Sequence, residues 1–427
     1  MFCALFLALL FLLCAAFPAS AVDKPDKPKN IKACLVYNPE NRVTIYDSWA
    51  NVRVSPGPVV KLMTAIVAAE LLSSRLDDTV LVSAAMLSGV TGNTIGLKMG
   101  EHVKIRDMLY AMLICGANDA AQVLAITATG SFDKFVAKMN ERAAELGATS
   151  TKYETLTGLD LGTAKTTVTD TLTIALYAYS IPVLAEIFSC STYTMGATDR
   201  AEARTFTSKN RFVTPGDTYY YDGAFHLSFG SSTPSGHCMV VMVRRAAISY
   251  VCVILGAESA SDLYAAGRTL LNYAFAEYEY KTILSTRDVV GELPVKNAAT
   301  PQVTVSPTTS VSVYARTDEE VASRMTLDVH LTDVPLYAPL KAGVPVGYAD
   351  VYFDGQLIRQ VDLVTSFAVE QSHWLYFWYT VRQTLFTEAT LIVLGLVGAA
   401  AGVLALIALH HKKKHPIRDD ADLDLHK

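Results

Sequence analysis

The chain has no excess of basic residues: 36 lysines and arginines stand against 41 acidic residues in 427, a formal net charge of −5. It therefore lacks the electrostatic footprint of a nucleic-acid-binding protein. Cysteine is also scarce. The five cysteines beyond the first 21 residues lie in apolar strings without metal-site spacing, and their odd number leaves at least one unpaired: Cys34, Cys115, Cys190, Cys238 and Cys252. We expect buried small hydrophobes there, and no metal or other cofactor.

The beginning of the chain lacks charge altogether. Phe2 to Phe17 are continuously apolar and lead into Ala19-Ser-Ala21, a small-x-small sequence typical of a cleaved secretory leader. We therefore expect a signal peptide over residues 1–21 and a disordered Lys/Asp/Pro-rich spacer over 22–31. The basic residues that usually precede the apolar stretch are missing, so an uncleaved anchor is the alternative.

A second uncharged stretch, 389–409, lies near the other end of the chain. Its 21 residues would cover the hydrocarbon core of a bilayer, about 30 Å, as one helix. The basic cluster His410 to Arg418 follows it, and such clusters stay in the cytoplasm. The sequence therefore predicts a single-pass cell-membrane protein with a cytoplasmic tail over 410–427 and its main domains outside. Aromatic residues at helical spacing predict an interfacial amphipathic helix over 372–388.

The most informative segment is Ser55 to Ala69. An apolar run after Lys61 predicts a buried helix, and Pro58 falls near its start, where a missing N–H costs nothing. In Ser-x-x-Lys acyl-transfer enzymes a serine three residues before the lysine lies over it on the same helix face and loses its proton to the amine. Here that position is Pro58. The activating base is present and the nucleophile is missing.

Other segments match the order of motifs in one enzyme family. They are Tyr37 to Tyr46, which predicts a strand–turn–strand; Asn118 followed by Asp-Ala-Ala; the block Phe132 to Gly158; and Gly230 to Val241, with a glycine and an apolar strand. Together they resemble the serine D-alanyl-D-alanine carboxypeptidases, the low-molecular-weight penicillin-binding proteins, from about Ala33 to Val364.

This resemblance implies an α+β fold. It implies a serine β-lactamase/transpeptidase-like domain over 32–282, with a mostly antiparallel sheet covered by helices on both faces. A small all-β domain, a β-sandwich stalk, is expected over 283–368, where Val303 to Val305, Val311 to Tyr314 and Leu327 to Leu331 alternate apolar and polar residues. Asp354-Gly355 predicts a hairpin turn there. A transmembrane helix would follow.

Matched residue by residue, all three catalytic motifs of the family are degraded. Family positions are retained at Lys61, Asn118 and Gly230 and lost at Pro58, Gly116, Ser228 and Phe229, where the family has two serines, a lysine and a threonine. The lost groups are the nucleophile, a proton-relay hydroxyl, and the cation and hydroxyl that hold the substrate's terminal carboxylate. Loss of a nucleophile alone costs roughly a millionfold in kcat in subtilisin.

We therefore expect a non-catalytic family member that binds a peptidoglycan stem peptide or a cell-wall protein partner and no nucleic acid. Substrate-binding positions would be Ser228, Gly230 and His226, with His226 and Ser228 on one face of a strand. Phe229 would put an apolar ring where the family binds the carboxylate, which disfavours a free carboxyl terminus.

Two alternatives remain from the sequence. One is an active carboxypeptidase with unconventional residues, such as a displaced nucleophile at Ser55 or a new Ser228–His226 pair. The other is a structural surface protein whose cleft has closed. Lys61 would contact solvent or the carbonyl of Asn118, and Asn118 would brace the loop between helices.

Overall fold

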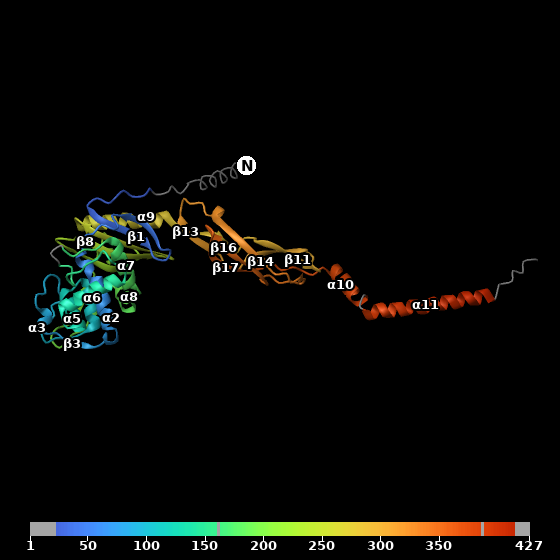
Figure 1. The fold of residues 1–427 in the computed structure, drawn as a ribbon, viewed down its shortest axis with the longest axis horizontal. Coiled ribbons are helices and arrows are strands. Elements are labelled where there is room, and N and C mark those ends of the chain that lie inside the picture. Colours follow the sequence, from blue (N-terminus) through green and yellow to red (C-terminus); the bar gives the residue numbers. More distant parts are fainter. Residues whose placement is uncertain (1–22, 160–162, 386–387, 415–427) are drawn as a thin grey trace, which may run out of the picture. The chain divides into compact units, whose positions relative to one another are not determined.

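The computed structural model describes residues 23–159, 163–385 and 388–414 (Figure 1). The expected signal peptide over 1–21 lies outside the described residues. The chain divides into two compact units, one running to Glu279 and including Tyr314–Glu319, the other comprising Tyr280–Val313 and the residues from Glu320 onward.

The first unit is built on a five-stranded antiparallel sheet. Its strands, in spatial order, are β2 (Val43–Ser48), β1 (Ile31–Asn38), β9 (Ile248–Ala257), β8 (Gly236–Arg245) and β7 (Ala224–Ser232). The strand–turn–strand expected over 37–46 is the β1–β2 hairpin.

Both faces of this sheet are buried, as the central strand β9 shows. Val251, Val253 and Leu255 belong to one core cluster, whereas Cys252 and Ile254 belong to a second. Successive strand side chains point to opposite faces, so the two clusters lie on the two faces of the sheet. Helix α9 (Ala260–Glu277) packs in the second cluster, and the other helices of the unit supply the first. The expected sheet with helices on both faces is confirmed.

Helix α2 (Lys61–Leu71) is the centre of the first cluster. It follows a 3-10 turn, η1 (Gly57–Val60), and nine of its eleven residues are buried. Pro58 stands in this first turn, where a missing N–H leaves no bond unmade. The helix start predicted from the sequence is confirmed.

The remaining elements of the unit are η2 (Ser73–Arg75), β3 (Thr79–Leu81), α3 (Ala84–Leu87), β4 (His102–Lys104), α4 (Ile105–Tyr110), η3 (Ala111–Cys115), α5 (Asn118–Thr129), α6 (Phe132–Glu145), α7 (Val168–Ser180), α8 (Pro182–Phe188), β5 (Thr192–Met195), β6 (Arg204–Thr207) and η4 (Arg211–Val213).

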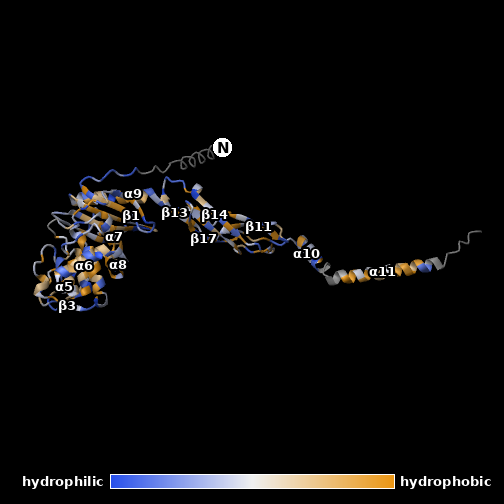
Figure 2. Cartoon of the chain, viewed as in Figure 1, coloured by the Kyte–Doolittle hydropathy of each residue, from blue (hydrophilic) through white to orange (hydrophobic). Residues whose placement is uncertain are grey.

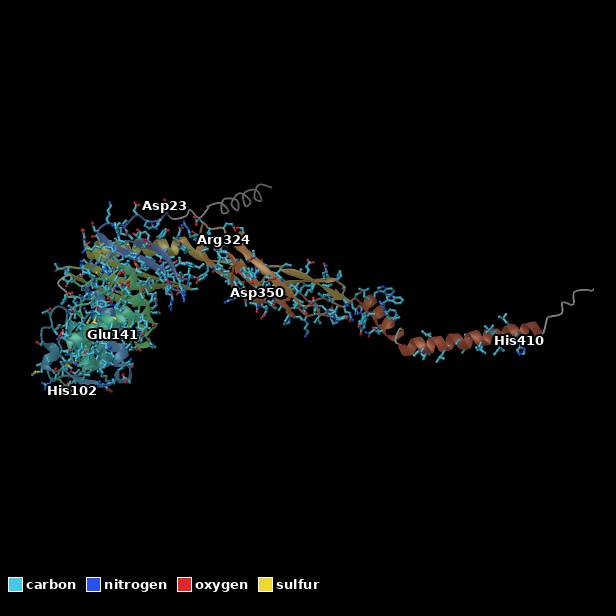
Figure 3. All side chains as sticks on the ribbon, viewed as in Figure 1. Asp23, His102, Glu141, Arg324, Asp350 and His410 are labelled. Carbon is cyan, nitrogen blue, oxygen red and sulfur yellow. The ribbon has the colours of Figure 1, made fainter. Side chains whose placement is uncertain are left out.

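The second unit is rich in strands. A six-stranded sheet has the order β14 (Met325–Leu331), β16 (Pro345–Phe353), β17 (Gln356–Thr365), β12 (Gln302–Pro307), β11 (Gly291–Lys296) and β15 (Leu336–Tyr337); β10 (Tyr278–Leu284) pairs with β13 (Val311–Arg316), and η5 (Ala322–Arg324) is a short turn. Asp354 and Gly355 form the two-residue turn between β16 and β17, both with positive φ (51° and 74°), so the hairpin prediction is confirmed. Gln360 donates to Asp350, which Figure 3 labels, across the same pair of strands. The predicted all-β domain is confirmed.

Two helices follow this β domain, α10 (His373–Leu385) and α11 (Glu388–Lys414). Within α11, Ile392–His411 forms a 20-residue stretch that is long and apolar enough to cross a membrane, and none of it is buried. The ribbon of α11 is mostly orange, for hydrophobic residues, in Figure 2, and His410 lies near its C-terminal end (Figure 3). On α10, exposed aromatic side chains include Trp374, Phe377 and Trp378.

Candidate functional site

A cleft of about 280 Å³ brings together most of the residues that the sequence singled out. Seven of the eight line it: Pro58, Lys61, Gly116, Asn118, His226, Phe229 and Gly230. The eighth, Ser228, is buried and does not line the cleft. The start of α2, the junction between η3 and α5, and strand β7 thus meet at one place, although more than one hundred positions separate some of them.

Pro58 is tightly packed among glycines. A Cβ placed on Gly230 would lie 2.8 and 2.9 Å from Cβ and Cγ of the Pro58 ring, so the strand backbone and the ring are in direct contact. A Cβ on Gly158 would lie 1.9 Å from the carbonyl oxygen of Gly57. Gly158 also has a φ of +79°, a conformation that side-chain-bearing residues rarely adopt. The turn that carries Pro58 is therefore fixed on two sides.

Lys61 is buried at the bottom of the cleft. Only 7% of the residue is exposed, and its Nζ donates to the carbonyl oxygen of Thr157 at 3.0 Å. Burial lowers the pKa of this amine to about 8, because desolvation penalises the charged form. The amine thus bonds to Thr157 O and not to the carbonyl oxygen of Asn118, and Lys61 lines the cleft.

Asn118 begins helix α5 and braces the loop before it. Its Nδ2 donates to Thr91 O at 2.7 Å, and its backbone N–H donates to Asn93 O at 2.7 Å. Gly92 has positive φ, and a Cβ there would lie 2.9 Å from Asn118 Nδ2, so the loop passes close against the amide. The bracing expected from the sequence is present. Oδ1 of Asn118 is buried and accepts no hydrogen bond from the described residues.

Strand β7 departs from the alternation assumed in the sequence analysis. The pairing register with β8 shifts between His226 and Ser228, so the two residues do not lie on one face as expected, and Ser228 is buried away from the cleft. The ring of Phe229 stacks on Tyr264 at 5.8 Å between centroids, in the core beneath α9. Phe229 therefore lines the cleft while its ring stacks on Tyr264, and its effect on a carboxylate ligand stays a prediction.

His226 is engaged with other groups and forms no pair with Ser228. Its Nε2 lies 2.9 Å from Leu113 O and its Nδ1 lies 3.5 Å from Asn210 Nδ2. Burial lowers the pKa of the imidazole to about 4, so the ring is neutral at pH 7. A neutral Nε2–H donates to the Leu113 carbonyl, which joins β7 to η3.

The cleft also contains residues that sequence reasoning missed. Lys209 places its Nζ 2.7 Å from Oδ1 of Asn93, and both residues line the cleft. Cys115 lines it as well, and its Sγ donates to Ala111 O at 3.1 Å. Cys115 directly precedes Gly116, which the sequence analysis matched to the second motif, so it could have been found. Nothing local in the sequence marks Lys209. Ser55, proposed as a displaced nucleophile, is buried and does not line the cleft.

Comparison with known proteins gives a consistent picture. Residues 22–259 match the family described as D-alanyl-D-alanine carboxypeptidase, and residues 278–371 match the penicillin-binding protein 5 C-terminal domain. The D-alanyl-D-alanine carboxypeptidase DacF of Bacillus subtilis is 23% identical over 358 residues, covering 81% of this chain and 88% of its own. The carboxypeptidase DacB2 of Mycobacterium tuberculosis is 35% identical over 172 residues, covering 40% of this chain and 57% of its own.

A solved structure shows the same fold over most of the chain. Penicillin-binding protein 5 from Haemophilus influenzae superposes with a TM-score of 0.57 at 19% identity, covering 82% of this chain and all of that one (100%).

Proposed function

Because this chain belongs to the D-alanyl-D-alanine carboxypeptidase family, we propose that it serves in cell-wall metabolism as a non-catalytic member, which binds a peptidoglycan stem peptide in its cleft without cleaving it. One observation carries the proposal. Pro58, which the sequence analysis matches to the position of the family's nucleophile, packs against Gly230, and Lys61 and Asn118 line a cleft of about 280 Å³. A cleft with room for a ligand and a proline at that position supports binding without cleavage.

An active enzyme would need another nucleophile in the cleft. The side chains that could supply one include Ser231 and Cys115. Burial raises the pKa of the Cys115 thiol, so it is protonated at neutral pH and a poor nucleophile. Among the described residues, no general base is identified that would take the proton from the Ser231 hydroxyl. A closed, purely structural surface protein fits less well, because the cleft has room for several side-chain-sized groups.

We further propose that α11 spans the cell membrane once, with its basic C-terminal end, Lys412 to Lys414, in the cytoplasm. Ile392–His411 supports this because it is long, apolar and unburied. The aromatic helix α10 would lie at the membrane interface, where tryptophan and tyrosine side chains are favoured. The cleft would then work outside the cytoplasm, where the peptidoglycan is.

Acylation by a penicillin tests the non-catalytic part. The full chain in detergent micelles is incubated with a labelled penicillin beside the Bacillus subtilis carboxypeptidase, and both are measured by intact-protein mass spectrometry. We expect an adduct on the Bacillus protein and none on this chain, because acylation needs a nucleophile held about 3 Å from the carbonyl. A stoichiometric adduct would contradict the proposal, and its position would identify the unconventional nucleophile.

A further inference from the structure

Two arginines outside the cleft lie against one buried tyrosine. Arg245, at the end of β8, and Arg268, on α9, place their guanidinium carbons 4.6 and 5.5 Å from the centre of the Tyr221 ring. The two cations are therefore about 10 Å apart at most. Neither arginine lines the cleft, so this cluster is separate from the site described above.

The charges of these two arginines are not balanced within the described part of the chain. Neither side chain forms an ion pair with a carboxylate there, whereas six arginines of the first unit do: Arg75, Arg106, Arg142, Arg204, Arg211 and Arg316. Two like charges so close together repel each other. An anion that binds to both would remove this repulsion, so the cluster favours an anionic ligand.

Backbone carbonyls hold both guanidinium groups. Nη2 of Arg268 donates to the carbonyl oxygens of Tyr219 and Tyr220, at 3.0 Å each. Nε of Arg245 donates to the carbonyl oxygen of Asp222 at 3.4 Å. A guanidinium carries five N–H donors, so most of them are left for a ligand. Both arginines are half-buried and anchored, which reduces the side-chain entropy that is lost when a ligand binds.

The shared aromatic ring is fixed as well. Tyr221 is 2% exposed, its hydroxyl donates to Asn272 Oδ1 at 2.8 Å, and its ring stacks on Phe212 at 5.5 Å between centroids. Phe275 adds a second ring, whose centre lies 4.7 Å from the guanidinium carbon of Arg245. Cation–π attraction keeps each guanidinium against its ring. The two charges are therefore presented at a fixed spacing.

The shape of the anion decides which ligand fits two such groups. A guanidinium fork binds the oxygens of a carboxylate or of a phosphate in pairs. A planar carboxylate presents both of its oxygens to one fork. A tetrahedral phosphate directs its oxygens to several sides, and a chain of phosphodiesters repeats the charge at short intervals. Two forks at this spacing therefore fit phosphate groups better than a single carboxylate.

We propose that Arg245 and Arg268 form a binding site for phosphodiester groups, carried by an anionic polymer or by the headgroup of an anionic lipid. The phosphate oxygens accept hydrogen bonds from both guanidinium groups, and no covalent step is involved. The site goes beyond the proposed function and does not depend on it, because it uses no residue of the cleft.

Fluorescence anisotropy tests the site. The full chain, in micelles of an uncharged detergent at low salt, is titrated with labelled poly(glycerol phosphate) and with labelled polyglutamate of the same total charge. The wild type should bind the phosphate polymer about 10-fold or more tightly than polyglutamate. Arg245→Met with Arg268→Met should weaken phosphate-polymer binding by about 10-fold or more, the size of one charge-assisted hydrogen bond. Arg53→Met with Lys134→Met removes two exposed charges elsewhere and should behave as wild type.

Two results would overturn the proposal. Equal binding of the two polymers by the wild type would show attraction to any polyanion and no recognition of phosphate. Unchanged binding by the double arginine variant, with urea unfolding that shows a folded protein, would show that these residues are not the site. If the double variant does not fold, Arg245→Met alone decides between the same outcomes, because Arg245 donates one bond to the loop and Arg268 donates two.

The source of the phosphate is decided by competition. Glycerophosphoglycerol, the soluble headgroup of phosphatidylglycerol, is added to the complex of the wild type with the labelled polymer. Displacement at the same concentration of phosphate groups would assign the site to a single lipid headgroup. Displacement only at about 10-fold or more excess would assign the site to a polymer that binds both arginines through neighbouring phosphates.

Discussion

The cleft and the C-terminal helices depart from the usual distribution of residues in opposite directions. The cleft buries polar groups: Lys61 and Asn118 are 7% and 4% exposed. The C-terminal helices expose apolar ones: Trp374 on α10 is 67% exposed, and Leu404 on α11 is also 67% exposed. Buried amines and exposed apolar stripes both cost free energy in water. Under the proposed function, a ligand would cover the polar groups of the first region and a membrane the apolar side chains of the second.

The largest expected effect concerns the membrane side of this comparison. Deleting residues 388–427 should convert the protein from carbonate-resistant to carbonate-extractable in washed membranes, because the only single helix in the described residues long and apolar enough to span would be removed. Deleting 419–427 is the control and should leave resistance unchanged. Continued resistance of the longer deletion would show that the N-terminal leader stays uncleaved as an anchor.

A second effect, still several orders of magnitude, concerns the chemistry of the cleft. Pro58→Ser with Gly116→Ser should allow slow labelling by penicillin, since nucleophile and relay hydroxyl return beside Lys61. Loss of a nucleophile costs roughly a millionfold, so mass spectrometry over hours should distinguish the variants. Pro58→Ala with Gly116→Ser should stay unlabelled. Labelling of Pro58→Ser alone would show that the relay hydroxyl is dispensable.

Packing under the cleft gives a smaller effect. Gly158→Ala should lower the free energy of unfolding by about 3 kcal/mol or more, because its Cβ would lie 1.9 Å from the Gly57 carbonyl oxygen. Gly147→Ala is matched in φ (+81°) but has open space around the Cβ, so it should cost only about 1 kcal/mol. Urea unfolding measures both. Equal losses would mean that the Pro58 turn can move away.

The smallest effect is the pH dependence that His226 introduces. The pKa of His226 is about 4 in the folded protein and 6.5 in the unfolded chain. The stability that the neutral ring contributes to the folded state is therefore fully present above pH 6.5 and is lost as the pH falls toward 4. The wild type should lose about 2–3 kcal/mol more than His226→Gln across this window, as followed by urea unfolding. His237→Gln should retain the wild-type slope. If the free energy of unfolding of His226→Gln changes with pH as much as that of the wild type, a group other than His226 causes the pH dependence.

Local rules predicted the parts of the fold that depend on neighbours in sequence. A proline before an apolar run favours a helix start, as Pro58 does here. Asp354-Gly355 predicts a hairpin because both residues tolerate positive φ. The cleft around Lys61 and Asn118 was also expected, through the resemblance of its motifs. The exact limits of the domains and the cleavage of the leader remain predictions.

The errors have physical reasons as well. Strict alternation placed His226 and Ser228 on one face, but one register shift in β7 ended the alternation there. Lys209 could not be found from local pattern, because it enters the cleft only through tertiary structure, bonded to Asn93 more than one hundred residues earlier. The stacking of Phe229 on Tyr264 could not be predicted either, because it joins residues that are distant in sequence.

Cys115 gives the cleft a natural attachment point for a spectroscopic probe. Cys34, Cys238 and Cys252 are buried, and burial raises the pKa of each thiol, so they react slowly with electrophiles. Cys190 is the other partly accessible thiol, and a Cys190→Ser background would leave Cys115 as the one partly accessible thiol in the described part of the chain. Because burial also raises the pKa of Cys115, its labelling needs an alkaline buffer. A fluorophore attached there would report occupancy of the cleft directly, which the proposed function requires because binding without cleavage would leave no product to assay.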